Sequence, residues 1–270
     1  MNILDTIVER TKERIREEKR EIPPEEMRDW AEAADRGEKE SLPEFERALR
    51  RKGLSFICEV KKASPSKGLI APEFPYLEIA EDYETAGAAA ISCLTEPYWF
   101  KGSDRYLEEI ARRVHIPVLR KDFTCDEYMV YQAKAMGASA VLLICAVLDD
   151  GELRAYHQLA AELGMAALVE AHSAEEIDRA KDAGARIIGV NNRNLKDFTV
   201  DIGRSMELRK LVGPDTVFVS ESGIRGPEDM RALYENGTDA VLIGEMLMRA
   251  PDRREALESL KKAVAKEAKL

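Results

Sequence analysis

The chain has 270 residues, and its 41 Lys and Arg against 51 Asp and Glu give a formal net charge of -10. A negative net charge repels phosphate backbones and anionic lipid headgroups, so we expect no nucleic-acid partner and no membrane partner. No apolar stretch approaches the roughly 18 residues needed to span a bilayer, and the N-terminal segment lacks the apolar region of a signal peptide. A cytoplasmic location is therefore predicted.

The first fifty residues predict a helical arm. Apolar residues from Ile3 to Ile15 recur at helical spacing among many charged residues. The expected helices cover 3–20, about 27–34 after a break at Pro23-Pro24, and a short segment that Ser41 caps and that ends near Arg51. An arm with so many charged residues cannot form a hydrophobic core by itself. We therefore divide the chain into an arm, 1–50, and a remainder, 51–270, on which the arm packs.

From Leu54 onward, short apolar runs alternate with longer helical patterns. Strands are expected near 55–61, 89–95, 117–122, 140–145, 166–171, 187–192, 217–222 and 239–244. Helices are expected near 76–86, 104–114, 126–136, 149–163, 174–183, 203–212, 227–236 and 250–268. The apolar runs are nearly continuous in Val, Ile, Leu and Ala, which is typical of parallel strands covered on both faces.

A weak internal repeat marks every second strand. Gly87, Gly137, Gly184 and Gly237 each end a predicted helix and precede an apolar run, at intervals of about fifty residues. Glycine there supplies the left-handed conformation that terminates a helix. Two strand–helix units per repeat and four repeats predict an α/β fold, namely a (β/α)8 TIM barrel with an N-terminal helical extension. A doubly wound open sheet is the alternative.

Charged residues stand at the ends of the odd-numbered predicted strands, where barrel enzymes carry their active residues. They are Glu59 and Lys61 on the first strand, Lys121 on the third, Glu170 on the fifth and Glu221 on the seventh. Any one of them is more often a solvated rim residue or half of a structural salt bridge. Because burying opposite charges in one layer costs desolvation energy, five of them on strands of the same parity favour a site for proton transfer.

The remaining strand ends predict a site for an anionic substrate. Asn191 and Arg193 share a face after the sixth strand, and an Arg beside an amide suits a planar carboxylate, although an ordinary Asn-rich turn has the same composition. Gly223 and Gly244 follow the seventh and eighth strands, where backbone N–H groups commonly bind a phosphate. Phe100, after the second strand, is a candidate to stack on a substrate ring.

The sequence predicts no metal and no nucleotide cofactor. His115, His157 and His172 are scattered, without ligand spacing to one another or to a cysteine. The glycines form neither a G-x-G-x-x-G motif nor a Walker loop. The four widely spaced cysteines are expected to be reduced thiols.

Several segments resemble the signature of indole-3-glycerol phosphate synthase, the tryptophan-pathway barrel that closes the indole ring. The longest is 56–66, FICEVKKASPS, and the others follow in order as 121–123 KDF, 168–170 LVE, 191–195 NNRNL, 221–223 ESG and 242–245 LIGE. The resemblance covers essentially the whole chain, and it implies that the arm packs across the barrel mouth. Since the chain ends soon after the eighth predicted helix, we expect no fused second enzyme.

The resemblance implies a carboxy-lyase with a phosphorylated small-molecule substrate and no cofactor. The family reaction takes 1-(2-carboxyphenylamino)-1-deoxyribulose 5-phosphate to indole-3-glycerol phosphate by ring closure, loss of CO2 and dehydration. An alternative is another phosphate-binding barrel enzyme, such as phosphoribosylanthranilate isomerase or the α subunit of tryptophan synthase. A barrel that only binds a phosphorylated ligand is a further alternative.

The resemblance also implies residue roles. Lys121 would protonate the ketone oxygen, with Lys61 as a second acid, while Glu59 and Glu170 handle the later proton transfers. The catalytic set is Glu59, Lys61, Lys121, Glu170, Asn191 and Glu221, the last of which orients the substrate. Substrate binding falls to Ser64, Phe100, Phe123 and Arg193, and phosphate binding to Lys61, Ser222, Gly223, Gly244 and Glu245. Some relatives have serine at position 245, and a carboxylate cannot donate a hydrogen bond, so only backbone N–H groups could help there.

Overall fold

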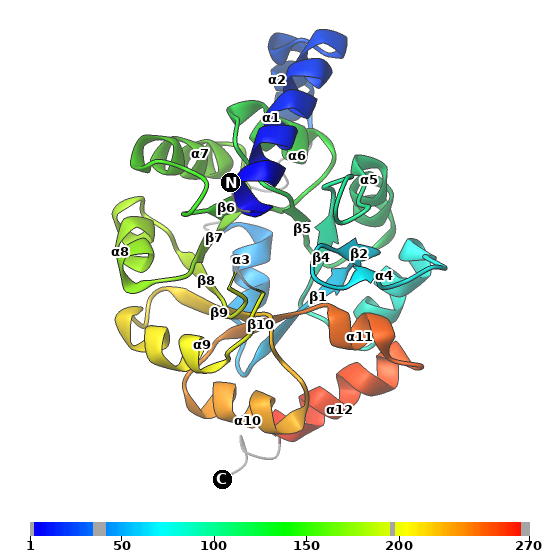
Figure 1. Cartoon of the computed structure of the whole chain (residues 1–270), viewed down its shortest axis with the longest axis vertical. Helices are drawn as coiled ribbons and strands as arrows, with labels where there is room; N and C mark the ends of the chain where they lie inside the picture. The colour runs from blue at the N-terminus through cyan, green and yellow to red at the C-terminus, as the bar shows by residue number, and fades with distance from the viewer. Residues whose placement is uncertain (1–2, 35–41, 195–197, 266–270) are drawn as a thin grey trace.

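The computed structural model describes residues 3–34, 42–194 and 198–265, and its centre is a closed barrel of parallel strands (Figure 1). Each barrel strand pairs with its neighbours in chain order, and the last pairs with the first. The barrel strands are β1 (Ser55–Val60), β4 (Ala90–Leu94), β5 (Val118–Lys121), β6 (Ala140–Ile144), β7 (Ala166–Ala171), β8 (Ile187–Asn191), β9 (Val217–Glu221) and β10 (Ala240–Ile243). The predicted barrel is confirmed, and the open sheet is wrong.

Helices follow the barrel strands and surround them. They are α4 (Tyr76–Thr85), α5 (Asp104–Arg113), α6 (Glu127–Ala135), α7 (Asp150–Glu162), α8 (Ala174–Asp182), α9 (Gly203–Leu208) with the 3-10 turn η1 (Arg209–Leu211), α10 (Pro227–Glu235) and α12 (Arg253–Ala265). A hairpin of β2 (Ala63–Ser64) and β3 (Gly68–Leu69) and a short helix α11 (Glu245–Arg249) were not predicted. The last helix was predicted from residue 250 but begins at Arg253, and residues 266–268 of that prediction lie outside the described part of the chain.

The strand residues separate an inner core from an outer one. Ile57, Leu119 and Val219 point into the barrel and are buried there. Val141 and Ile188 belong to the larger core that joins the strands to the surrounding helices. Because successive strand residues alternate between faces, apolar runs without alternation supply both cores at once.

The glycine repeat has the predicted conformation. Gly87, Gly137, Gly184 and Gly237 have positive φ values between 77° and 86°. Each follows a helix whose last turn it closes, and the next strand starts within three residues. A side chain is strained in this conformation, which accounts for glycine at all four positions.

The first two helices of the arm lie against one side of the barrel. α1 (Ile3–Glu21) and α2 (Pro24–Ala33) run beside α6 (Figure 1). Ile15 and Met27 are buried there against Tyr128 and Met129. The start of α1 reaches the open end of the barrel, where Leu4 and Ile7 line a cavity. The helical spacing therefore predicted the buried face of α1.

The third helix of the arm, α3 (Glu44–Leu49), covers the opposite end of the barrel. Phe45 and Leu49 are fully buried in the inner core, together with the first residues of the strands. Ser41, the predicted cap of this helix, lies outside the described residues, and Pro43 occupies the cap position without a side-chain hydrogen bond. The arm thus contacts both ends of the barrel.

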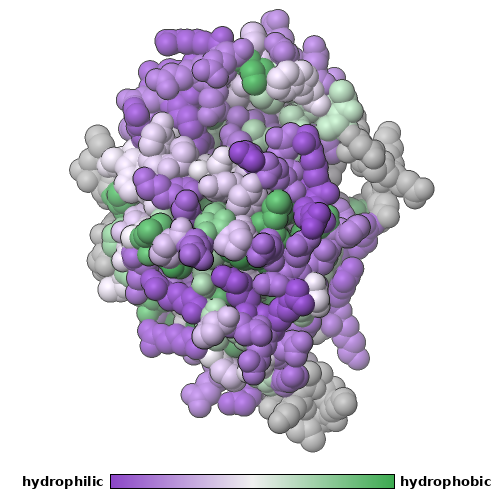
Figure 2. All heavy atoms as spheres, turned by 90° about the vertical axis from the view of Figure 1, so that its right-hand side faces the viewer, coloured by the Kyte–Doolittle hydropathy of each residue, from purple (hydrophilic) through white to green (hydrophobic). Residues whose placement is uncertain are grey.

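The surface is mostly hydrophilic on the face that Figure 2 shows, with apolar residues in small groups. Among the described helices, none combines the length and the apolar character needed to cross a membrane. All four cysteines are free, and three of them are buried, as the apolar sequence around them predicts.

Candidate active site

A cavity of about 670 Å³ opens at the carboxyl ends of the barrel strands. Every residue that the sequence singled out for catalysis, substrate binding or phosphate binding lines it. These are Glu59, Lys61, Ser64, Phe100, Lys121, Phe123, Glu170, Asn191, Arg193, Glu221, Ser222, Gly223, Gly244 and Glu245. Positions scattered over nearly two hundred residues of sequence are therefore brought to one site by the barrel.

Lys121 lies at the centre of a buried cluster of charges. Its Nζ is 2.8 Å from Oε2 of Glu170 and 2.8 Å from Oε2 of Glu221. Lys61 pairs with Glu59 in the same cavity. The group holds two ammonium ions and three carboxyls, so one carboxyl has no matching positive charge. Such a layer is costly to bury, which favours a chemical role over a structural one.

Burial and the charges of the neighbouring groups shift the pKa values of Lys121, Glu170 and Glu221. Burial would lower the pKa of Lys121, but the charges of Glu170 and Glu221 outweigh it and raise that pKa above its usual range. Burial also opposes ionisation of Glu170, yet Lys121 and His172 bring its pKa down to about 2. For Glu221, burial and repulsion by Glu170 prevail over Lys121 and raise the pKa to about 7. Glu170 is therefore ionised at neutral pH, while Glu221 is poised to gain or lose a proton.

Two glycines leave room for these carboxylates. A Cβ atom on Gly189 of β8 would overlap Oε1 of Glu221, which projects from the neighbouring strand. A Cβ atom on Gly244, after β10, would overlap Oε1 of Glu59 and lie 3.0 Å from Nζ of Lys61. Gly189 was not predicted as a site residue. The available signal is a glycine inside an apolar strand, which often marks a close approach.

Asn191 connects the charged cluster to the binding end of the cavity. Its Nδ2 donates to Oε1 of Glu170 over 3.2 Å, and its Oδ1 accepts from the backbone N–H of Arg193 over 3.0 Å. Leu195, the last residue of the motif that contains both, lies outside the described residues. The side chains of Asn191 and Arg193 thus line the same cavity, as their shared strand face predicts.

The loops after β9 and β10 form a rim with several positive charges. Ser222 and Gly223 have φ values of 66° and 87°, which turns the backbone sharply at the end of β9. Arg225, Arg249 and Lys67, the last from the turn between β2 and β3, also line the cavity, and none of the three was predicted as a site residue. Only the proximity of Arg225 to Gly223 in the sequence could have indicated one of them. Backbone N–H groups and cations together suit a phosphate.

Glu245 stands among these cations. Its carboxylate is 3.2 Å from Nε of Arg249, 3.7 Å from Nζ of Lys67 and 3.9 Å from Nη2 of Arg193. This side chain cannot donate to a phosphate. It instead forms ion pairs with three cationic side chains at the rim.

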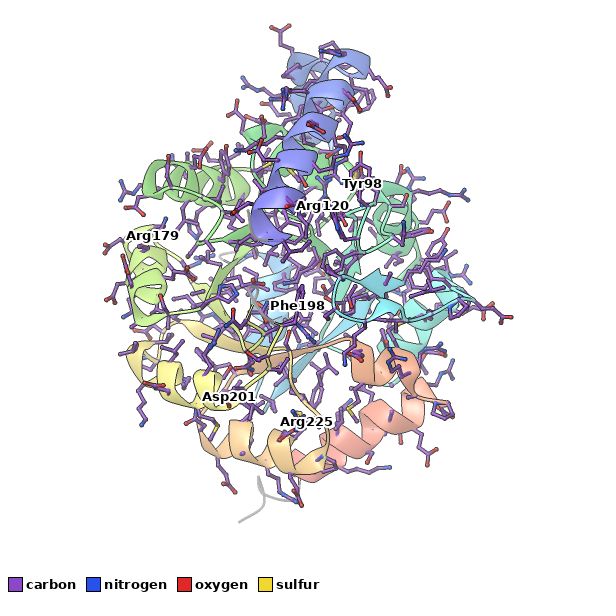
Figure 3. The ribbon with its side chains drawn as sticks, in the orientation of Figure 1. Tyr98, Arg120, Arg179, Phe198, Asp201 and Arg225 are labelled. Atoms are coloured by element: carbon purple, nitrogen blue, oxygen red, sulfur yellow. The ribbon has the colours of Figure 1, made fainter. Side chains whose placement is uncertain are left out.

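The opposite wall of the cavity is apolar and aromatic. Phe100 and Phe123 lie with ring centroids 6.0 Å apart. Phe198, which was not predicted as a site residue, also lines the cavity from the loop after β8, and Figure 3 shows it near the middle of the barrel. The buried carboxylate of Glu96 accepts hydrogen bonds from the backbone N–H groups of Tyr98, Trp99 and Phe100, at 2.8 to 2.9 Å. The loop that carries Phe100 is therefore rigidly held.

The arm is tied to the strand that carries Lys121. Nη2 of Arg14, in α1, is 2.8 Å from Oδ2 of the buried Asp122, which also accepts from Thr95. Burial works against the ionised form of Asp122, but Arg14 and Arg120 lower its pKa. The pair therefore links the arm to the residue next to Lys121.

Within the described residues, no group of three or more His, Cys, Asp or Glu side chains could hold a metal ion. One histidine, His172, lies beside the charged cluster around Lys121, with its Nε2 3.5 Å from Oε1 of Glu170. The scattered histidine positions in the sequence gave no sign of this contact.

Solved structures with the same fold include 3-hexulose-6-phosphate synthase from Salmonella typhimurium and thiamine phosphate pyrophosphorylase from Pyrococcus furiosus. The first has a TM-score of 0.66 and 14% sequence identity, and covers 79% of this chain and 99% of its own. The second has a TM-score of 0.60 and 21% identity, and covers 81% of this chain and 98% of its own. At such identities the likeness supports the fold alone.

Sequence relatives are far more similar. A protein from Ruminiclostridium cellulolyticum is 52% identical over 259 residues, covering 96% of this chain and 98% of its own, and one from Endomicrobium trichonymphae is 52% identical over 96% and 99%. Both are named indole-3-glycerol phosphate synthase. The family model described as indole-3-glycerol phosphate synthase matches residues 4–260. The chain therefore belongs to the indole-3-glycerol phosphate synthase family.

Proposed function

We propose that six side chains of the cavity carry out the carboxy-lyase reaction of this family on a phosphorylated small molecule. The chain acts as an indole-3-glycerol phosphate synthase in tryptophan biosynthesis. It converts 1-(2-carboxyphenylamino)-1-deoxyribulose 5-phosphate to indole-3-glycerol phosphate with loss of CO2 and water. The six residues are Glu59, Lys61, Lys121, Glu170, Asn191 and Glu221.

One observation carries the proposal. The ammonium of Lys121 lies 2.8 Å from two buried carboxylates, inside a cavity that has cations at its rim and aromatic rings on its wall. Ring closure requires a proton at the ketone oxygen when the aromatic carbon attacks the carbonyl carbon. An ammonium in a partly dry site supplies that proton and stabilises the developing charge. A protein that only binds a phosphorylated ligand would not need this cluster.

The later steps require a base and a second acid. After CO2 leaves, a carbon-bound proton must be removed and the hydroxyl must depart as water. Glu170 and Glu59 are the proposed partners for these transfers, and Lys61 is the second acid because it pairs with Glu59 beside the phosphate loops. Glu221 keeps Lys121 in place and orients the substrate.

Substrate orientation follows from charge and shape. The phosphate is proposed to bind Lys61 and the loop residues Ser222, Gly223, Gly244 and Glu245, the last through its backbone. The anthranilate carboxylate is proposed to bind Arg193 and Ser64, and its ring to pack against Phe100 and Phe123. Lys121 would then face the ketone between the two ends.

The chain is also proposed to work in the cytoplasm, without nucleic-acid, membrane or cofactor partners. The net charge of -10 and the four free cysteines support this proposal.

Incubation of the purified chain with the carboxyphenylamino sugar phosphate tests the function. The fluorescence of the indole product should rise with time, and CO2 should form in equal amount. A chain that is folded but yields no indole product would contradict the proposal.

A further inference from the structure

The proposed reaction consumes one proton in each turnover. The ketone oxygen gains a proton as the new carbon–carbon bond forms, and the bond to the carboxylate then breaks with its electron pair returning to the ring. The hydroxyl takes a second proton and leaves as water, while the adjacent carbon gives up one proton. Two protons are supplied and one is returned, so one proton must come from solvent.

The groups that exchange these protons have little access to solvent. Glu170 is 2% exposed and Glu221 is 1% exposed. A substrate that fills the cavity would separate them further from bulk water. Proton supply to these two carboxyls through the mouth is therefore restricted while substrate is bound.

His172 stands on the other side of Glu170. Its Nε2 is 3.5 Å from Oε1 of Glu170, and its Nδ1 is 3.3 Å from Oε2 of Glu176. The backbone N–H of His172 donates to that same oxygen of Glu176 over 2.7 Å. Nε2 is buried, and no described group completes a hydrogen bond with it. Only the imidazolium form offers an N–H to each of the two carboxylates.

The charges around His172 favour that form. Burial acts against the imidazolium, but the hydrogen bond to Glu176 and the charges of Glu170, Glu176 and Glu221 raise the pKa of His172. Lys121 faces the far side of Glu170 and is matched by the two carboxylates that it contacts.

A second cavity gives His172 a route to solvent. It measures about 630 Å³ and is lined by His172, Glu176 and Arg204, together with the exposed residues Asp5, Ser173 and Glu207. Glu170 lines the substrate cavity and His172 lines the second one. The contact between the two side chains is therefore a connection between the two cavities.

We propose that His172 is a proton carrier that takes protons from solvent in the second cavity and passes them to Glu170. The inference rests on the proposed function. The Nε2–H bond of the imidazolium breaks and leaves its electron pair on nitrogen, while an O–H bond forms at Oε1 of Glu170. The neutral Glu170 then turns and passes this proton to Nζ of Lys121, which lies 2.8 Å from its carboxyl and has given its own proton to the ketone oxygen. His172 turns toward the second cavity and is protonated again.

Replacing His172 by alanine tests the carrier. In dilute buffer, His172→Ala should lower kcat about 100-fold, at the low end of acid–base effects, and leave KM nearly unchanged. Added imidazole should restore kcat in a saturable manner, because the second cavity admits it and it can take over the transfer. His172→Gln, which keeps the volume, should show the same loss. His115→Ala is the matched control, because that side chain is 93% exposed and distant from the site.

The pH dependence gives an independent readout. His172 can donate a proton as an imidazolium at pH values below its pKa, and it loses this ability as the pH rises above that pKa. Glu176→Gln removes the hydrogen bond that raises this pKa, so the alkaline loss of kcat should move to lower pH.

Two outcomes overturn the carrier. One is a kcat of His172→Ala within twofold of the parent chain in dilute buffer, and the other is a loss that imidazole does not restore, which indicates a purely structural role. A parent chain that forms no indole product refutes the proposed function itself. An active parent with an unaffected His172→Ala variant refutes the carrier alone.

Discussion

The carboxyl of Glu221 in β9 fills the space beside Gly189 of β8, where a Cβ atom on the glycine would overlap Oε1 of the glutamate. A Cβ there would also come within 3.1 Å of Leu168. The absence of a side chain in one strand therefore determines where the carboxyl of the next strand can lie. Through Glu221 it also determines the position of Lys121.

Gly189→Ala should displace the Glu221 carboxyl and reduce activity. We expect kcat to fall by about 10-fold or more, and the free energy of unfolding to fall by about 1–3 kcal/mol because the barrel interior is overpacked. Gly213→Ala is the control, since no atom lies near its added Cβ. Steady-state kinetics and urea unfolding of both variants check the expectation, and a fully active Gly189→Ala would show that the site adapts to the extra atom.

Glu221 should also make stability depend on pH. Its pKa is raised by burial to about 7, from an ordinary value of 4.5. A carboxyl whose pKa is higher in the folded state favours folding when protonated, so its contribution is complete below about 4.5 and is lost as pH rises through about 7. Glu221→Gln cannot ionise and should lose less stability than the parent chain between pH 5 and pH 8.

Urea unfolding at the two pH values measures this difference. Glu25→Gln, at an exposed position in α2, is the control and should behave as the parent chain does. Equal losses of stability in Glu221→Gln and the parent would mean that Glu221 does not change its ionisation between pH 5 and pH 8.

The barrel could be predicted because its signals are local and repeated. Continuous apolar runs and the recurring glycines each report on one strand or one helix end, and the closed topology follows from their number. For the same reason, the sequence could predict that Lys121, Glu170 and Glu221 share a site, because they lie at the ends of alternate barrel strands. Strand geometry alone sets which residues share a layer.

Other parts of the site depend on contacts that no local pattern records. Arg249 lines the cavity from the unpredicted short helix α11, and Phe198 comes from a loop without a periodic pattern. The contact of His172 with Glu170 depends on the path of the loop after β7. These positions are set by tertiary packing, which sequence spacing does not determine.

The arm is expected to serve substrate binding through α1 and stability through α3. Deletion of residues 1–34 removes Leu4 and Ile7 from the cavity wall and should raise KM more than it lowers kcat. It also leaves the buried Asp122 without Arg14, so the melting temperature should fall moderately. A deletion through residue 49 additionally removes Phe45 from the inner core and should prevent stable folding.

Kinetics and thermal unfolding of the two truncated chains distinguish these effects. An unchanged KM in the shorter deletion would remove α1 from substrate binding. A stable chain after the longer deletion would mean that α3 is dispensable at the base of the barrel.

The general acid is tested at Lys121. Lys121→Met keeps the length and apolar bulk of the side chain but deletes the proton, so the barrel should still fold. Loss of general acid catalysis costs about 10²- to 10⁴-fold, which is roughly 3 to 5 kcal/mol of barrier. The loss should appear chiefly in kcat, because the cations at the rim still bind the ground state. Lys121→Arg should be poor as well, since a guanidinium keeps the charge but releases its proton reluctantly. Steady-state kinetics with circular dichroism as the folding control decide the matter, and a near-normal kcat in Lys121→Met would transfer the acid role to Lys61.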